Sequence, residues 1–285
     1  MSFSLCSIAV PHFELNVSMY ALMLALGGFA GIIVCILRAP TKDALGVGKL
    51  KVFLCTLYAA AFGLVGAKLF FVVGNLKSVL DGSVHIYTLL LSGQMFYGGF
   101  WGGLLGVLLF SKLVKTRPVL FFDALAVGLA LTQSIGRIGC FFAGCCHGAQ
   151  TDGAFSIVYS QSAAPDTPLN TPLVPVQLIE SAFCLLIFVI LMLYGAQKSA
   201  GKNRGVKIRR DGNAFVLYCV LYAVFRFIVE FWRGDPVRGF VGALSWSQFI
   251  GVLILIGVGI YLTVRNILRR KKIGLEFSQN FLENF

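Results

Sequence analysis

The sequence predicts an all-α polytopic membrane protein with about seven transmembrane helices and a small external head insertion. Hydrophobic residues make up 58% of its 285 residues, charged residues only 13%, and the mean hydropathy is +0.84. Ordinary soluble domains are about 45–50% apolar and about 25% charged. A chain with so little polar surface is not a cytosolic enzyme, a disordered tail or a collagen.

The predicted spans are apolar segments long enough to cross a bilayer, which takes about 20 helical residues. They cover residues 17–37, 52–74, 96–112, 119–142, 177–196, 213–232 and 246–265. Residues 147–176 are the longest polar insert, rich in Ser, Thr, Asp and Pro, and are expected to form the external head, with short strands near residues 155–159. We expect residues 1–285 to form a single integral membrane domain that ends in a cytoplasmic tail, residues 266–285.

Basic residues gather beside the spans. Of the 24 Lys and Arg, 18 lie in four short segments, residues 38–51, 112–117, 198–210 and 265–272. Basic loops stay on the cytoplasmic side of a membrane, so this pattern predicts an external N-terminus and a cytoplasmic C-terminus. The same pattern argues for contact with anionic membrane lipids and against a nucleic-acid partner.

Three further basic residues, Lys68, Arg137 and Arg226, lie inside or near the ends of spans. A charge at bilayer depth costs about 2.5–3.5 kcal/mol on insertion scales, so it needs a partner or a wet cavity. Glu230 and Arg233 follow Arg226 at helical spacing on the same face. The group is either a structural ion-pair network or a cavity for an anionic headgroup. We favour the cavity, because cations outnumber acids and Arg matches phosphate oxygens with paired hydrogen bonds.

Several short motifs resemble, in order, those of the bacterial prolipoprotein diacylglyceryl transferases. The segment GRIGCFFAG at residues 136–144 resembles the family signature G-R-x-G-N-F-x-N-G. Further segments resemble the family's Y-G-L-M, G-A-R-L, F-H-G-G, P-S-Q-L-Y-E, F-R-x-x-V-E-F-x-R and S-x-G-Q motifs. In the same order, they are YALM at 20–23, GAKL at 66–69, FYGG at 96–99, PVQLIE at 175–180, FRFIVEFWR at 225–233 and LSWSQ at 244–248. Each motif alone is weak, but the ordered set over about residues 18–265 is specific.

The resemblance implies transfer of a diacylglyceryl group from phosphatidylglycerol to a thiol, the lipobox cysteine of a prolipoprotein, or to another acceptor, with release of glycerol phosphate. It implies a multi-pass enzyme of the bacterial inner membrane that needs no cofactor. By family match, Arg137 and Arg226 would hold the headgroup, and Glu230 would orient Arg226. The other substrate-binding positions implied are Tyr20, Lys68, Gly98, Gly99, Cys140, Gln177, Glu180, Arg233 and Gln248. For the two glycines, a tight helix contact is an equally good interpretation.

Two departures from the family motifs fall on positions that carry the chemistry. Tyr97 replaces the family's histidine, and a phenol with an ordinary pKa of about 10 is a poorer base at neutral pH than an imidazole at about 6.5. Tyr97 remains a candidate catalytic residue if a neighbouring arginine lowers its pKa or if the thiol arrives ionised. Cys140 and Ala143 replace the two signature asparagines, and Lys68 keeps a charge but loses the guanidinium fork.

The sequence also adds a cluster, Cys140-x4-Cys145-Cys146-His147. These side chains could ligate zinc or an iron–sulfur cluster, two thiols could form a disulfide on an oxidising outer face, or the group could simply pack at a helix end. A thiol could also act in catalysis, or His147 could replace the missing base. The spacing does not require Cys140 and Cys145 to converge. We favour packing, predict no bound metal, and keep His147 as a candidate catalytic residue.

Two other classes of function stay open on the sequence. The retained arginines could bind an anionic phospholipid in a noncatalytic protein, and the cysteine cluster could serve a thiol-redox membrane protein. A transfer assay with labelled phosphatidylglycerol and a lipobox peptide separates the transferase from both.

Overall fold

The computed structural model describes residues 4–10, 13–39, 47–83, 85–91, 96–162, 164, 166–196, 212–234 and 240–283. Within these ranges, six helices are long and apolar enough to cross a membrane, and a shorter apolar helix covers Gly98–Leu113. The prediction of an all-α polytopic membrane protein is confirmed. The predicted span at residues 96–112 corresponds to the shorter helix.

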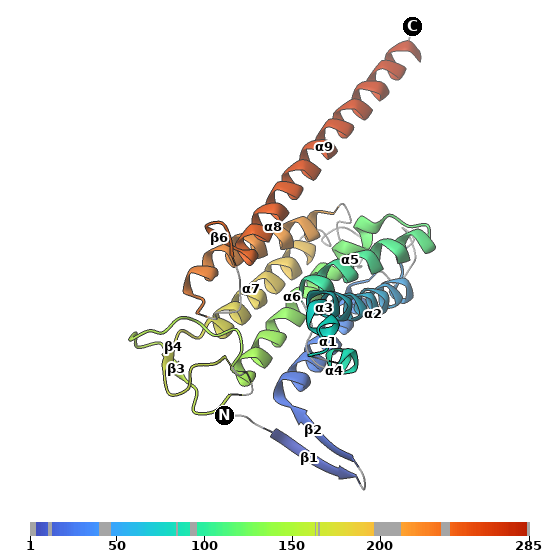
Figure 1. The fold of residues 1–285 in the computed structure, drawn as a ribbon. Helices are drawn as coiled ribbons and strands as arrows, with labels where there is room; N and C mark the ends of the chain where they lie inside the picture. The colour runs from blue at the N-terminus through green and yellow to red at the C-terminus, as the bar shows by residue number, and fades with distance from the viewer. Residues whose placement is uncertain are drawn as a thin grey trace. The chain divides into compact units, whose positions relative to one another are not determined.

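The helices follow the chain in the order shown in Figure 1. They are α1 (Met19–Arg38), α2 (Lys49–Gly74), α3 (Leu76–Leu80), α4 (Ile86–Leu91), α5 (Phe96–Leu113), α6 (Pro118–Ala143), α7 (Val176–Ala196), α8 (Asn213–Val229) and α9 (Trp246–Glu283). A single 3-10 turn, η1 (Glu230–Trp232), continues α8. Helix α9 runs on through most of the segment expected to form the cytoplasmic tail, whose side of the membrane stays a prediction.

The described strands form antiparallel pairs. They are β1 (Ser4–Val10) with β2 (Phe13–Ser18), β3 (Ile157–Val158) with β4 (Pro172–Leu173), and β5 (Phe240–Val241) with β6 (Leu244–Ser245). In the second pair Ile157 faces Leu173, which confirms the short strand expected near residues 155–159. The first pair, a hairpin ahead of α1, was not expected from the sequence.

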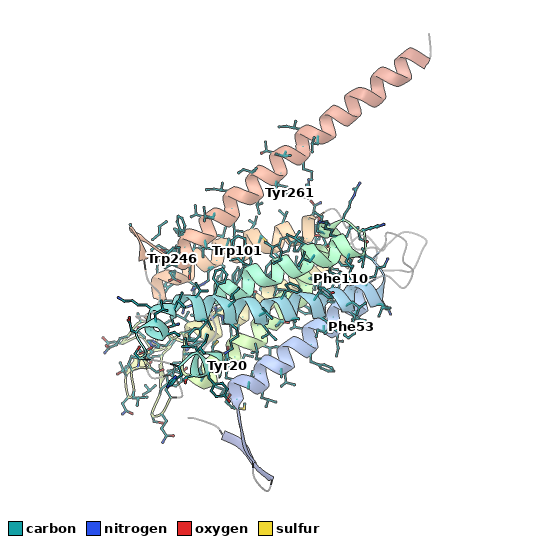
Figure 2. All side chains as sticks on the ribbon, turned by 45° about the vertical axis from the view of Figure 1, so that its right-hand side comes forward. Tyr20, Phe53, Trp101, Phe110, Trp246 and Tyr261 are labelled. Atoms are coloured by element: carbon teal, nitrogen blue, oxygen red, sulfur yellow. The ribbon has the colours of Figure 1, made fainter. Side chains whose placement is uncertain are left out.

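Large apolar side chains remain exposed along the spanning helices. Trp101 on α5, Trp246 on α9 and Leu64 on α2 are 55%, 44% and 59% exposed. Figure 2 shows such side chains projecting along these helices. Exposed apolar surface of this extent marks contact with lipid rather than with water.

The chain divides into two compact units. Unit 1 comprises residues 1–21, 137–187 and 216–285, and unit 2 comprises residues 22–136 and 188–215.

In unit 2, α2 and α5 approach each other through glycines. A Cβ at Gly98 would overlap the carbonyl oxygen of Gly66, and one at Gly102 would overlap that of Phe62. A Cβ at Gly99 would lie 3.5 Å from that of Ala67, an ordinary contact. The close helix contact is therefore present at Gly98, which had also been assigned to substrate binding. Small residues serve this purpose where lipid offers no hydrophobic driving force between helices.

In unit 2, a carboxylate inside one predicted span stabilises the start of another helix. Asp123 on α6 is fully buried. Its Oδ2 accepts a hydrogen bond from the Gly212 N–H at 2.7 Å, and its Oδ1 accepts one from the Phe215 N–H at 2.9 Å. The first N–H groups of a helix lack intrahelical partners, so Asp123 stabilises the start of α8.

In unit 1, the end of α6 is covered by side chains from the head segment, residues 147–176. The chain leaves α6 at Gly144, which has φ +79°. The last carbonyls of a helix have no partner within it. Here three hydroxyl groups of the head segment donate to them. The Tyr159 hydroxyl donates to the Phe141 oxygen at 3.0 Å, and the Ser162 hydroxyl donates to the Ala143 oxygen at 3.0 Å. The Thr167 hydroxyl donates to the oxygen of Gly144, the residue after the helix, at 3.1 Å. These bonds fix the backbone around residues 140–147.

Candidate active site

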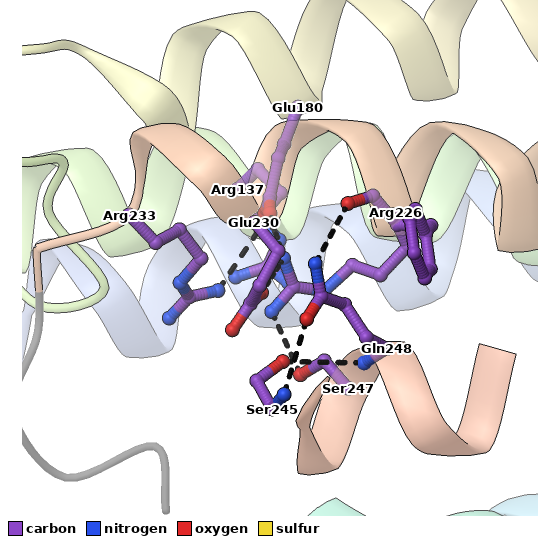
Figure 3. Close-up of polar contacts among 9 residues, drawn as sticks. Arg137, Glu180, Arg226, Glu230, Arg233, Ser245, Ser247 and Gln248 are labelled. Carbon is purple, nitrogen blue, oxygen red and sulfur yellow. Dashed lines mark hydrogen bonds and ion pairs between the residues drawn. The ribbon is translucent and has the colours of Figure 1, made fainter. Parts of the chain in front are cut away.

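Three arginines of unit 1 converge on one buried carboxylate, as Figure 3 shows. Glu180, in the second turn of α7, accepts Arg137 Nε at 2.5 Å through Oε2. Its Oε1 lies 3.2 Å from Arg226 Nη1 and 3.6 Å from Arg233 Nη1. Arg226 also pairs with Glu230 Oε2 at 2.7 Å, one helical turn further along. Residues from α6, α7, α8 and η1 therefore meet at one point.

The group carries more positive than negative charge. Its three guanidinium groups face two carboxylates, which leaves one net positive charge. The side chains of Glu180 and Glu230 are 3% and 2% exposed, whereas Arg137 is 20% exposed. The ion pairs correspond to the structural network that the sequence allowed, and the cavity for an anionic headgroup stays a prediction.

Arg233 is positioned by the backbone of the head segment. The Gly234 N–H donates to the His147 oxygen at 3.2 Å, and the Ala149 N–H donates to the Trp232 oxygen at 2.8 Å. Gly148 and Arg233 form an isolated antiparallel bridge. The head segment and the end of α8 therefore form one framework around the arginines.

The start of α9 supplies another polar contact to the group. Ser247 Oγ accepts a hydrogen bond from Arg226 Nη2 at 3.0 Å. Ser245 and Gln248 form a reciprocal cap, with the Gln248 N–H on Ser245 Oγ at 3.2 Å and the Ser245 N–H on Gln248 Oε1 at 3.1 Å. Gln248 also donates to the Phe227 oxygen at 3.4 Å, so the contacts it makes here fix the helix start.

Gln177, in the first turn of α7, is fully buried. Its Nε2 donates to the Cys145 oxygen at 2.8 Å and lies 3.5 Å from the Tyr159 hydroxyl. Burial raises the pKa of Tyr159 to about 12, so the hydroxyl stays protonated and donates to α6. Within the part of the chain that is described, Gln177 Oε1 has no hydrogen-bond partner. A buried acceptor of this kind is suited to a ligand hydroxyl.

Three free thiols lie together at the end of α6. The Sγ atoms of Cys140, Cys145 and Cys146 are all within 4.8 Å of one another. Cys146 has φ +57°, an uncommon conformation for a residue with a side chain. Hydrogen bonds from the other two thiols lower the pKa of Cys146, and the charges of Arg137 and Arg233 lower it further. Hydrogen bonding to its two neighbours raises the pKa of Cys145. The convergence that the spacing left open is therefore present.

The ring of His147 is held by backbone carbonyls. It is 3% exposed, with Nδ1 3.0 Å from the Gly148 oxygen and Nε2 3.3 Å from that of Asp166. Each ring nitrogen faces a backbone carbonyl of the head segment, and the catalytic role of His147 stays a prediction.

The remaining predicted site residues divide between the units. Tyr20 lies in unit 1, in the first turn of α1. Lys68, Gly98 and Gly99 lie on α2 and α5 in unit 2. Tyr97 lies on α5, but its side chain falls outside the described residues.

Sequence reasoning did not assign Ser247 or Tyr159 to the site. The Ser-x-x-Gln pattern at residues 245–248 is a recognisable capping signal and could have placed Ser247 at a helix start, but not beside Arg226. Nothing in the sequence marks Tyr159, because its partners lie in α6 and α7.

Comparisons with known proteins identify the family of this chain. The sequence profile of the family described as prolipoprotein diacylglyceryl transferase matches residues 7–265. The chain is 33% identical over 262 residues to phosphatidylglycerol–prolipoprotein diacylglyceryl transferase 2 of Clostridium perfringens, covering 92% of this chain and 96% of that protein. It is 34% identical over 250 residues to the phosphatidylglycerol–prolipoprotein diacylglyceryl transferase of Clostridium tetani, covering 87% and 94%. A third relative of that name, from Clostridioides difficile, is 26% identical over 262 residues, covering 91% and 96%.

Proposed function

Because the chain belongs to the prolipoprotein diacylglyceryl transferase family, we propose that it transfers the diacylglyceryl group of phosphatidylglycerol to the cysteine thiol of a prolipoprotein. The observation that carries this proposal is the convergence of Arg137, Arg226 and Arg233 within a helical membrane protein. The relatives' names describe transferases and give no support to a noncatalytic lipid-binding or thiol-redox function.

The reaction is an alkyl transfer from a phosphodiester. The thiolate sulfur attacks the glyceryl carbon and forms a C–S bond, while the C–O bond to phosphate breaks and its electron pair leaves with glycerol phosphate. The proton lost by the thiol is balanced by one taken up by the phosphate. Negative charge grows on the leaving phosphate, so fixed cations close to it stabilise the transition state.

The charge of the site suits this donor. One net positive charge in the arginine group matches the single negative charge of a phosphodiester. Arg137 is the most exposed of the three, 20% against 11% for Arg226 and 6% for Arg233. We assign Arg137 to first contact with the phosphate, and Arg226 and Arg233 to stabilising the developing charge.

Two further features of unit 1, a buried acceptor and an apolar hollow, suit the glycerol headgroup and an acyl chain of the lipid. The orphaned Gln177 Oε1 can accept a hydrogen bond from a hydroxyl of the glycerol headgroup. An open apolar hollow of about 230 Å³ lies on α7 and α8 and offers a surface to an acyl chain. Its lining consists of Val174, Ile179, Phe225, Ile228, Val229 and Trp232.

The chain order supports a position at the outer face of the bacterial inner membrane. The end of α6, the start of α7 and the end of α8 carry the site. The opposite ends of these helices adjoin the basic segments at residues 112–117 and 198–210. If those segments are cytoplasmic, the site faces the outer leaflet, the N-terminus is external and the C-terminus is cytoplasmic.

The test is transfer in proteoliposomes that contain labelled phosphatidylglycerol and a lipobox peptide. We expect Arg226→Ala to lower kcat by about 10²–10³-fold, the usual cost of losing one donor to developing charge. Arg117→Ala, an exposed arginine beside α6, is the matched control and should retain activity. Full activity in Arg226→Ala would reject the role of the arginines. No transfer by the unaltered chain, in vitro or in a strain depleted of its own transferase, would reject the function.

A further inference from the structure

The three thiols at the end of α6 form a donor set that the transfer reaction described above does not use. The Sγ atoms of Cys140, Cys145 and Cys146 lie within 4.8 Å of one another, and each residue is only partly buried. Hydrogen bonds from the head segment hold the backbone that follows Cys140, at the carbonyls of Phe141 and Ala143. The triangle of sulfurs is therefore built on a fixed helix end.

The size of this triangle suits a thiophilic cation. Zinc binds thiolate sulfur at about 2.3 Å, and tetrahedral angles then place the ligand sulfurs about 3.8 Å apart. That spacing lies inside the 4.8 Å limit within which the three sulfurs fall. Sulfur ligands select zinc and similar soft cations over magnesium or calcium. A disulfide would use two of the thiols and leave the third without a role.

The described residues supply three ligands and no fourth. His147, the nearest candidate in sequence, has both ring nitrogens at hydrogen-bond distance from backbone carbonyls. Across the described ranges, no further His, Cys, Asp or Glu joins the group. Structural zinc sites have four protein ligands, whereas sites with three keep a position for water or substrate.

The thiols adjoin the arginine group. Arg137 precedes Cys140 by three residues on α6, and both arginines Arg137 and Arg233 lie within electrostatic range of Cys146. Gln177 donates to the Cys145 oxygen. Three thiolates and a divalent cation carry one net negative charge, and the guanidinium groups of Arg137 and Arg233 lie close enough to stabilise it.

We propose that Cys140, Cys145 and Cys146 bind one zinc-class cation, and that the acceptor's cysteine thiol occupies its open fourth position. The binding of the acceptor thiol to this cation rests on the proposed function. A thiol that binds zinc loses its proton, here to solvent, and the bound thiolate then attacks the glyceryl carbon. The C–O bond breaks toward the phosphate, which regains a proton from solvent, and the neutral thioether leaves the metal. No side-chain base is needed, which accounts for a tyrosine at position 97.

The first experiment measures the site without the reaction. The full chain, purified in detergent under reducing conditions, is reconstituted with Co²⁺ or Zn²⁺ alone. We expect one metal per chain and, with Co²⁺, a thiolate-to-metal charge-transfer band. Cys145→Ser and Cys146→Ser should weaken binding at least 100-fold. Cys219→Ser, a thiol in the middle of α8, should leave it unchanged.

The second experiment asks what the fourth position takes. A lipobox peptide should change the Co²⁺ spectrum, and the same peptide with serine in place of cysteine should not. In the unaltered enzyme, a soft-metal chelator should lower transfer at least 100-fold, and Zn²⁺ but not Mg²⁺ should restore it. The chelator measurement uses no variant, so a folding defect cannot account for the loss of transfer.

The outcomes separate this proposal from the proposed function. Transfer that survives complete metal removal, or a disulfide between any two of the three thiols in the active protein, would overturn the metal site and leave the function standing. Stoichiometric metal binding with no response to the peptide would overturn the acceptor step. A metal-loaded protein that binds the peptide thiol but transfers nothing from phosphatidylglycerol would confirm the site and reject the function.

Discussion

At the scale of single residues, Glu180 decides how the three arginines are arranged. It pairs with Arg137, Arg226 and Arg233 and is only 3% exposed. Removing one partner of a buried ion pair leaves uncompensated charge and costs about 3–5 kcal/mol. The carboxylate therefore positions the arginines, and in the function proposed above the phosphate of the substrate is the further anion that they bind.

We expect Glu180→Gln to lower the thermal unfolding midpoint and to reduce transfer at least tenfold, because three guanidinium groups lose their common anchor. The midpoint and the kcat and KM for phosphatidylglycerol measure this. Asp152→Asn, an exposed carboxylate in the head segment, is the control and should change neither. A variant that unfolds normally and binds lipid unchanged would contradict the anchoring role.

Part of this residue-scale arrangement follows from the sequence and part does not. The cost of a charge at bilayer depth requires Arg137 and Arg226 to find partners, and the spacing of Arg226 and Glu230 identifies one pair directly. The choice of Glu180 as the common partner depends on how α7 packs, which no local pattern encodes. The convergence of the thiols depends likewise on the turn at Gly144.

At the scale of elements, the motif at the start of α9 stabilises the first turn of that helix. Ser245 and Gln248 cap the helix reciprocally, and Ser247, one of the two residues between them, contacts Arg226. Sequence reasoning assigned Gln248 to substrate binding, which stays a prediction, and its contacts in the structure fix the start of α9 beside Ser247.

We expect Ser245→Ala to lower the free energy of unfolding by about 0.5–2 kcal/mol, the usual cost of losing such a cap. Ser247→Ala should leave stability unchanged but lower kcat/KM several-fold, because Arg226 loses a contact. Unfolding in detergent and transfer assays on the same preparations separate the two effects. Thr263→Ala, in the middle of α9, provides the comparison, and equal losses in all three variants would exclude a specific cap.

The glycines between α2 and α5 make a second prediction at this scale. Gly98→Ala places a methyl group on the backbone of Gly66, so the helices must separate. We expect loss of folded protein in the membrane, measured as the fraction that stays monodisperse after extraction. Gly259→Ala, with nothing within 4 Å of the added carbon, should be tolerated. Equal yields of the two variants would show that this helix pair is not tightly packed.

At the scale of the whole molecule, composition alone identified a helical membrane protein, because the chain has too few polar residues to cover a soluble surface. Six of the seven predicted spans correspond to helices long enough to cross a membrane, and the seventh to a shorter helix. The hairpin before α1 was missed, although Phe13–Ser18 alternates apolar and polar residues as a half-buried strand does.

The orientation of the whole chain can be tested by labelling. In the N-outside arrangement, a cysteine introduced at Asp152 reacts with an impermeant thiol reagent on intact spheroplasts. One introduced at Arg117 reacts only after the membrane is opened, because residues 112–117 then face the cytoplasm. Peptide mapping identifies the labelled positions. The reverse order of labelling would invert the topology and place the arginines on the cytoplasmic face.

The bonds from the head segment to α6 also bear on how this protein can vary between species. External loops ordinarily tolerate insertions and deletions more readily than any other part of a protein. Here Tyr159, Ser162 and Thr167 together complete the last turn of a helix, so the number of residues that separates them from one another is constrained. Changes of length should therefore collect at the exposed residues 152–155, and the stretch from 159 to 167 should keep its length even where its sequence drifts.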